Sequence, residues 1–167
     1  IRDSVGGGGG TAFPLRGRKR TVWEGGIKSL AFLRAPRSLL PAAHQSRGLG
    51  ADCVLLIMAA LDDATAAELE SCAFEYGMDV LIECHDDAEI KRAKKLKSTL
   101  IGINNRNLKT MEISLDVGEA MLPHLPSDRI AVAESGLFHP LDLARMAASG
   151  ARCFLIGESL MRADDVA

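Results

Sequence analysis

The sequence has no long apolar run and few aromatic residues. Only 4% of its 167 residues are aromatic. No apolar stretch approaches the roughly 18 residues that a transmembrane helix requires. The first ten residues, IRDSVGGGGG, contain no apolar segment of the kind found in secretory signals. We therefore expect a cytoplasmic protein without a membrane partner.

The chain also lacks paired cysteines. Its four cysteines, Cys53, Cys72, Cys84 and Cys153, are scattered, with no C-x-x-C pair and no histidine at metal-ligand spacing. This pattern is typical of reduced, mostly buried thiols in a cytosolic protein. We expect neither a disulfide framework nor a metal site.

Charge is distributed unevenly along the chain. Residues 1–50 hold nine Lys or Arg and two acids, a charge of +7, whereas residues 51–167 hold eleven Lys or Arg and twenty acids, a charge of −9. The one dense basic run, RGRKR (16–20), has no interleaved aromatic residues. This composition favours a solvated arm over a nucleic-acid-binding module.

From residue 50 onward, apolar runs alternate with segments of helical character. The expected strands are 53–60, 79–84, 98–104, 129–135 and 152–157, and the expected helices are 62–77, 86–97, 114–125, 139–150 and a last one from 158. Because the strands are continuously apolar, both of their faces should be covered, as in a parallel sheet built from βα units. Either a doubly wound open sheet or part of a (β/α)8 (TIM) barrel satisfies this pattern.

A dinucleotide-binding fold is not indicated. Such a fold places G-x-G-x-x-G after its first strand, with an acidic residue further on, and neither is present here. The glycine run at 6–10 follows no expected strand and is interpreted as a low-complexity linker.

Polar residues stand at the carboxyl ends of four consecutive expected strands, where parallel α/β proteins carry their chemistry. In chain order they are Glu83, then Asn104 with Arg106, then Glu134 with Ser135 and Gly136, then Gly157 with Glu158. Each one alone is also compatible with a helix cap or a turn. The repetition over four strands favours a common site.

These residue types suit acid–base chemistry on a phosphorylated small molecule. Two carboxylates in a partly apolar site at the strand ends can have different pKa values, so that one donates and the other accepts a proton. Asn104 could orient a hydroxyl or carbonyl, and the planar fork of Arg106 suits a carboxylate or phosphate. Gly136 and Gly157 follow the last two strands, where (β/α)8 barrels often bind phosphate.

Five segments closely resemble indole-3-glycerol-phosphate synthase: GADCVLLIMAALDD, GMDVLIECHD, IGINNRNLKTMEISL, PSDRIAVAESGL and FLIGESLM. The resemblance runs through residues 48–167 in the order of the family, a (β/α)8 barrel of tryptophan biosynthesis. It implies conversion of 1-(2-carboxyphenylamino)-1-deoxyribulose 5-phosphate to indole-3-glycerol phosphate, carbon dioxide and water, by a carboxy-lyase without metal or organic cofactor.

The resemblance assigns roles to the strand-end residues. It implies that Glu83, Asn104 and Glu134 are catalytic residues at the ends of barrel strands five, six and seven. The residues it implies for substrate binding are Arg106 near the anthranilate carboxylate, Ser135 beside Glu134, Gly136 and Gly157 in the phosphate-binding turns, and Glu158 at the start of the last helix.

The N-terminal third departs from the family. The family's strand-three motif LRKDF supplies a lysine that acts as general acid, and Ala35 stands at that position here. Segments FLR (32–34) and RGLGAD (47–52) fit the family, but the stretch between them does not, as after a reading-frame slip or real divergence. We expect residues 1–47 to form a partly disordered arm with a remnant of strand three, and 48–167 to form the C-terminal part of the barrel.

Five clear βα units cannot close an eight-stranded barrel, which needs about 250 residues. An open parallel edge exposes unpaired backbone groups, so self-association through that edge is one expectation. Two other interpretations remain open. One is a neighbouring phosphate-binding barrel enzyme of the tryptophan or histidine pathway, and the other is an inactive remnant that retains only phosphate or substrate binding.

Overall fold

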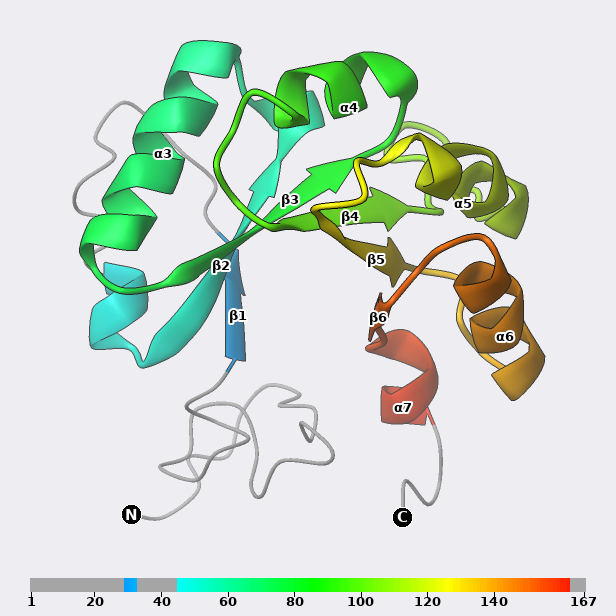
Figure 1. Ribbon diagram of the computed structural model, residues 1–167. Helices are drawn as coiled ribbons and strands as arrows, with labels where there is room; N and C mark the ends of the chain where they lie inside the picture. The colour runs from blue at the N-terminus through cyan, green and yellow to red at the C-terminus, as the bar shows by residue number, and fades with distance from the viewer. Residues whose placement is uncertain (1–28, 33–44, 163–167) are drawn as a thin grey trace, which may run out of the picture.

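The computed structural model describes residues 29–32 and 45–162, and its centre is one parallel sheet (Figure 1). The strands are β1 (Ser29–Phe32), β2 (Ala51–Ile57), β3 (Asp79–Cys84), β4 (Leu100–Asn104), β5 (Ile130–Glu134) and β6 (Cys153–Leu155). The helices are η1 (Met58–Ala60), α3 (Asp63–Glu75), α4 (Asp87–Ala93), α5 (Leu115–Met121), η2 (Leu122–His124), α6 (Pro140–Ala148) and α7 (Glu158–Arg162).

The strand order decides between the two architectures that the sequence pattern allowed. Neighbouring strands follow chain order, β1-β2-β3-β4-β5-β6, without reversal, and every pair is parallel. A doubly wound sheet reverses its strand order at a switch point, whereas a (β/α)8 barrel adds each strand beside the preceding one. Helices α3 to α6 form an arc along one side of the strands (Figure 1). The described residues therefore form an incomplete (β/α)8 barrel.

The five expected strands and five expected helices are confirmed, with shifts at some ends. The apolar run 53–60 is the clearest shift, because β2 ends at Ile57 and the next three residues form η1. Ile57 is the last residue of β2 that pairs with β3, opposite Glu83. Beyond that pair the chain turns toward α3, and the Leu61 N–H donates to the Met58 carbonyl to close the turn. The sheet also contains β1, which pairs with β2 and lies in the N-terminal part where a remnant of strand three is expected.

The helices begin where their sequences supply caps. The Asp62 side chain accepts a hydrogen bond from the Thr65 N–H at 2.7 Å at the start of α3, and Asp86 accepts from the Glu89 N–H at 2.8 Å at the start of α4. Such caps satisfy backbone donors that a helix leaves unpaired. They also fix where each chain segment leaves the carboxyl end of its strand.

The two faces of the sheet bury different sets of side chains. Alternate residues of β2 to β5, among them Val54, Ile82 and Ile103, pack under the helices in the main core. The opposite face carries a smaller apolar cluster formed by Leu55, Leu81 and Val132. The side chains of Glu83 and Glu134 share this second face, because they lie two residues beyond Leu81 and Val132.

Within the described part of the chain the sheet is open, with β1 and β6 as its end strands. No helix among these residues is long and apolar enough to cross a membrane. The predicted domain boundary at 47/48 and the position of Ala35 depend on residues 1–28 and 33–44, which lie outside the described residues, so both stay predictions.

Candidate active site

Three of the expected site residues come together at the carboxyl ends of β3, β4 and β5. Asn104 and Glu134 are the last residues of their strands and are register partners. Glu83, next to last in β3, pairs in register with Gly102. All three side chains are buried. The parallel register therefore joins side chains that are 51 residues apart in sequence, from Glu83 to Glu134.

Asn104 links the first carboxylate to the loop after β4. Its side-chain amide nitrogen donates to Glu83 Oε1 at 2.9 Å, and its side-chain oxygen accepts from the Arg106 N–H at 2.9 Å. The orientation of the amide is thus determined from both sides, since each end has its proper partner. Asn104 holds one oxygen of Glu83 in place.

Glu134 occupies space that only a glycine leaves free. A Cβ at Gly102 would lie 1.8 Å from Glu134 Oε1, far inside van der Waals contact. The carboxyl therefore rests directly over the backbone of β4. Its side chain is 2% exposed, and its Oε1 has no donor partner among the described residues. An unpaired buried carboxyl oxygen is uncommon, because burial without a partner is costly.

The two carboxyls have opposite shifts in proton affinity. Burial, and then the negative charge of Glu83, raise the pKa of Glu134 to about 9. Burial also acts to raise the pKa of Glu83, but contacts with His85 and Asn104 outweigh it, so the Glu83 pKa lies below its usual value. At neutral pH Glu134 is accordingly protonated and Glu83 ionised. One end of the sheet thus holds a proton donor beside a proton acceptor.

The turn after β5 is strained at Ser135. This residue has φ of +63°, and Gly136 follows with φ of +74°. A left-handed conformation is uncommon outside glycine and asparagine, and it is often retained near functional sites. The buried side chain of Asn105 stabilises the turn, because its amide nitrogen donates to the Ser135 carbonyl at 3.0 Å while its side-chain oxygen accepts from the Gly118 N–H at 2.9 Å. Asn105 was not among the expected site residues.

Arg106 and Glu158 form an ion pair. The Arg106 Nη2 atom lies 2.9 Å from Glu158 Oε2, and Arg162 contacts the other Glu158 oxygen at 2.9 Å. Both residues of the Arg106–Glu158 pair are part-buried. The structure therefore brings these two expected binding residues to each other. In this arrangement a negatively charged ligand would compete with Glu158 for Arg106.

Gly136 and Gly157 are the expected phosphate-binding glycines. Among the described residues, neither forms a hydrogen bond with the carboxyl of Glu83 or Glu134. A Cβ at Gly136 would meet the Ile113 side chain at 2.6 Å, so this turn packs closely on the loop before α5. Gly157 is exposed, and its carbonyl accepts the first α7 hydrogen bond from Met161 at 2.9 Å. Their role in phosphate binding stays a prediction.

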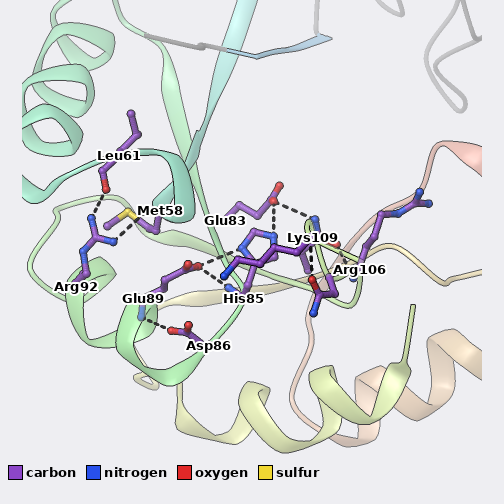
Figure 2. Close-up of polar contacts among 11 residues, drawn as sticks. Met58, Leu61, Glu83, His85, Asp86, Glu89, Arg92, Arg106 and Lys109 are labelled. Atoms are coloured by element: carbon purple, nitrogen blue, oxygen red, sulfur yellow. Dashed lines mark hydrogen bonds and ion pairs between the residues drawn. The ribbon is translucent and has the colours of Figure 1, made fainter. Parts of the chain in front are cut away.

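His85 and Glu89 lie beside Glu83, although neither stands at a strand end. The His85 ring lies between the two glutamates, with Nε2 3.0 Å from Glu83 Oε1 and Nδ1 3.1 Å from Glu89 Oε2 (Figure 2). A signal was present in ECHDDAEI: a histidine two residues after Glu83 shares its side of the strand, and an acid four residues later lies one helical turn away.

Arg92 fixes the neighbouring turn after β2. Its guanidinium donates to the carbonyls of Met58 and Leu61 (Figure 2). It also donates to the Asp63 carboxylate. The side chain thus ties α4 to the carboxyl end of β2. Among the described residues, no group of three or more His, Cys, Asp or Glu is arranged to hold a metal ion.

Comparison with known proteins establishes the family. The family described as indole-3-glycerol phosphate synthase matches residues 42–167. The chain belongs to this family. The synthase of Azospirillum brasilense is 58% identical over 122 residues, covering 73% of this chain and 47% of the relative. That of Rhodospirillum rubrum is 54% identical over 123 residues, with the same coverage. The chain spans about half the length of the synthases it matches.

Solved structures confirm the fold of this synthase-family chain. A structure of the tryptophan synthase complex from Pyrococcus furiosus superposes with a TM-score of 0.62 at 12% identity, covering 81% of this chain and 58% of that one. The N-acetylmannosamine-6-phosphate 2-epimerase of Clostridium perfringens gives 0.58 at 11% identity, covering 74% and 56%. At such identities these matches show the shared fold alone.

Proposed function

We propose that the chain carries the acid–base site of an indole-3-glycerol-phosphate synthase, which closes the ring of 1-(2-carboxyphenylamino)-1-deoxyribulose 5-phosphate with loss of carbon dioxide and water. The observation that carries the proposal is the buried pair at the ends of β3 and β5, with Glu83 ionised and Glu134 protonated. Family membership supports the choice of reaction.

The pair suits the loss of water from the closed ring. Dehydration breaks a C–O bond and the C–H bond of the adjacent carbon, so the departing hydroxyl needs a proton and the carbon must lose one. Glu134 supplies the first proton as a general acid, and Glu83 takes the second as a general base. Asn104, which holds Glu83 Oε1 at 2.9 Å, keeps the base in one orientation.

The remaining expected residues are assigned to substrate binding in this proposal. Arg106 binds the substrate's anthranilate carboxylate after that group displaces Glu158, since a guanidinium pairs with carboxylates through two parallel hydrogen bonds. Gly136 and Gly157 bind the phosphate, Ser135 contacts the substrate beside Glu134, and Glu158 opens the adjoining helix. No cofactor takes part. The earlier ring closure needs a proton for the ketone oxygen. The family resemblance gives this proton to a lysine, but Ala35 stands at that position here, so in this proposal the proton comes from solvent water.

The proposal is tested by product formation and by binding. The wild-type chain is mixed with the carboxyphenylamino-deoxyribulose phosphate, and indole product and carbon dioxide are measured. Glu83→Gln and Glu134→Gln should each lower the rate by about 10²–10⁴-fold. Glu68→Gln, an exposed substitution on α3, is the matched control. Binding of a reduced substrate analogue without turnover would support the binding-only alternative, and absence of both would overturn the proposal.

The open sheet supports a further part of the proposal, self-association. β1 and β6 end the described sheet, and such edges pair readily with another strand. Sedimentation velocity should show species larger than a monomer that dissociate on dilution. A monomer at all concentrations would contradict self-association.

A further inference from the structure

His85 follows β3 directly, and its ring is held between two carboxylates. The Nε2 atom is within ion-pair distance of Glu83 Oε1, at 3.0 Å, although the contact does not meet hydrogen-bond geometry. On the other side, Nδ1 lies 3.1 Å from Glu89 Oε2 with hydrogen-bond geometry. The three side chains are largely buried, the His85 side chain being 14% exposed. Figure 2 shows the ring between the two acids.

Glu89 is itself held by the first turn of α4. Its Oε2 accepts a second hydrogen bond, from the His85 N–H at 2.7 Å, and its own N–H donates to the capping residue Asp86 at 2.8 Å. Glu89 Oε2 therefore contacts both the backbone N–H and the ring Nδ1 of His85. The ring is anchored to the helix and faces Glu83 with its remaining nitrogen.

This arrangement favours the doubly protonated imidazole. A neutral ring has one N–H and one lone pair, so one of the two acids would face a lone pair. An imidazolium presents an N–H to each acid and places a positive charge between two negative ones. The cation therefore complements both neighbours.

We propose that His85 is a positioning residue that acts through Glu83: anchored as a cation by Glu89, it orients the Glu83 carboxylate and keeps it ionised beside Glu134. The consequence for catalysis rests on the proposed function. The electrostatic arrangement itself does not, since it involves only residues of this chain.

The charged surroundings are consistent with this role. Among the described residues, the charged groups that contact the ring are Glu83 from β3 and Glu89 from α4; Asp86 caps the same helix, and Glu134 interacts with Glu83. Burial acts to lower the pKa of His85, but contacts with Glu83 and Glu89 outweigh it and raise the pKa above its usual value. Lys109, labelled in the same view, forms no ion pair with these acids among the described residues.

A helix cap alone is the competing explanation, because Glu89 is the third residue of α4, where acids commonly reach back to the preceding backbone. The substitution Glu89→Gln separates the two. Glutamine keeps an oxygen that accepts the His85 N–H, so the cap survives while the negative charge is lost.

A second histidine–acid pair, between His124 of η2 and Asp87 of α4, provides the control. His124 Nδ1 lies 2.7 Å from Asp87 Oδ1, but both side chains are more than half exposed. Asp87→Asn removes a charge two residues from Glu89 without touching the ring between Glu83 and Glu89. Any effect of net charge alone should appear in this variant too.

The experiment is a pH titration of the 167-residue chain by NMR, following histidine ring and glutamate carboxyl resonances in wild type, Glu89→Gln, His85→Gln and Asp87→Asn. Glu89→Gln should lower the His85 midpoint by about one pH unit or more, a tenfold change in proton affinity. His85→Gln should raise the Glu83 midpoint by a similar amount. Asp87→Asn should leave the His85 and Glu83 midpoints unchanged.

Unchanged Glu83 midpoints in both Glu89→Gln and His85→Gln would overturn the proposal. If His85→Gln does not fold, Glu89→Gln decides alone, since it retains the ring and the cap: a fall in the His85 midpoint with a rise in that of Glu83 supports the proposal, and any other result overturns it. No substrate is present, so this result is independent of the turnover test of the proposed function.

Discussion

Both ends of the sheet bury glutamate side chains, and Glu70 at the amino end differs from Glu134 at the carboxyl end in its hydrogen bonding. At the amino end, Glu70 of α3 is 3% exposed and accepts hydrogen bonds from the N–H groups of Lys97 and Ser98, at 2.7–2.9 Å, just before β4 begins. At the carboxyl end, Glu134 is equally buried, yet its Oε1 has no donor. The first carboxylate is satisfied and structural, whereas the second keeps a proton.

The turns at the two ends differ in the same sense. At the amino end, left-handed positions after helices α3 and α6 are filled by Gly77 and Gly150, which adopt them without strain. At the carboxyl end, Ser135 takes a left-handed position. Backbone strain at a non-glycine residue thus lies where (β/α)8 barrels carry their chemistry, and the opposite end contributes stability.

The largest expected effect comes from removing the satisfied glutamate. Glu70→Ala should lower the free energy of unfolding by about 2–4 kcal/mol, because the buried N–H groups of Lys97 and Ser98 lose their acceptor. Urea denaturation measures it. Glu68→Ala, exposed on the same helix, should change stability by less than about 0.5 kcal/mol. Equal effects of the two substitutions would remove the basis for calling Glu70 structural.

A smaller loss is expected from Gly102→Ala at the other end. The new Cβ would take the place of Glu134 Oε1, and overpacking of this kind costs about 1–3 kcal/mol. The displaced carboxyl should also titrate nearer its ordinary pKa, which carboxyl NMR can follow. Gly48→Ala, at an exposed position with open space around it, is the control. A stable variant with an unchanged Glu134 titration would show that the close approach is not required.

The pH dependence of stability should reveal Glu134 itself. Its pKa is raised to about 9 in the folded chain, whereas the unfolded chain releases this proton near the ordinary glutamate value of about 4.3. The folded state therefore binds more protons between these values, and stability should fall as pH rises through this window.

In Glu134→Gln this loss of stability should disappear, because the amide does not ionise. Parallel urea denaturation series at several pH values compare the two chains. Curves of the same slope in wild type and Glu134→Gln would mean that Glu134 does not retain a proton in the folded state.

The smallest effect is expected from exchanging the turn residues. Ser135→Gly should raise stability by about 0.5–1 kcal/mol, since glycine adopts the left-handed conformation freely. Gly77→Ser should lower it by a similar amount, because no atom lies within 4 Å of the added Cβ and the backbone strain acts alone. Thermal denaturation measures both. Changes of the same sign would contradict the contrast between the two ends.

Much of the fold was predictable because local signals agreed with one another. Continuous apolar runs predicted β2 to β6, and acids at 62 and 86 predicted the starts of α3 and α4, which they cap. The extent of β2 was not predictable, since an apolar residue such as Met58 fits a strand or a buried turn equally well. Only the register with β3 determines that pairing stops at Ile57.

The candidate site was predictable in its carboxylates but not in its supporting residues. Glu83, Asn104 and Glu134 stand out as polar residues at the ends of apolar strands, and the structure brings them together. His85, Asn105 and Gly102 do not stand out in this way, because the role of each in the site depends on contacts with residues of other helices and strands. In the sequence, Gly102 looks like any glycine in a strand. Only the structure shows that Glu134 of the next strand lies over it.

The sequence by itself determined that this chain builds parallel βα units and places carboxylates, an amide and glycines at one end of them, because strand periodicity and helix caps act over short distances along the chain. The tertiary structure decided which carboxyl keeps its proton. Only the register of the sheet sets Glu134 over Gly102 without a donor while Asn104 and His85 contact Glu83, and proton affinity follows from these contacts between distant segments.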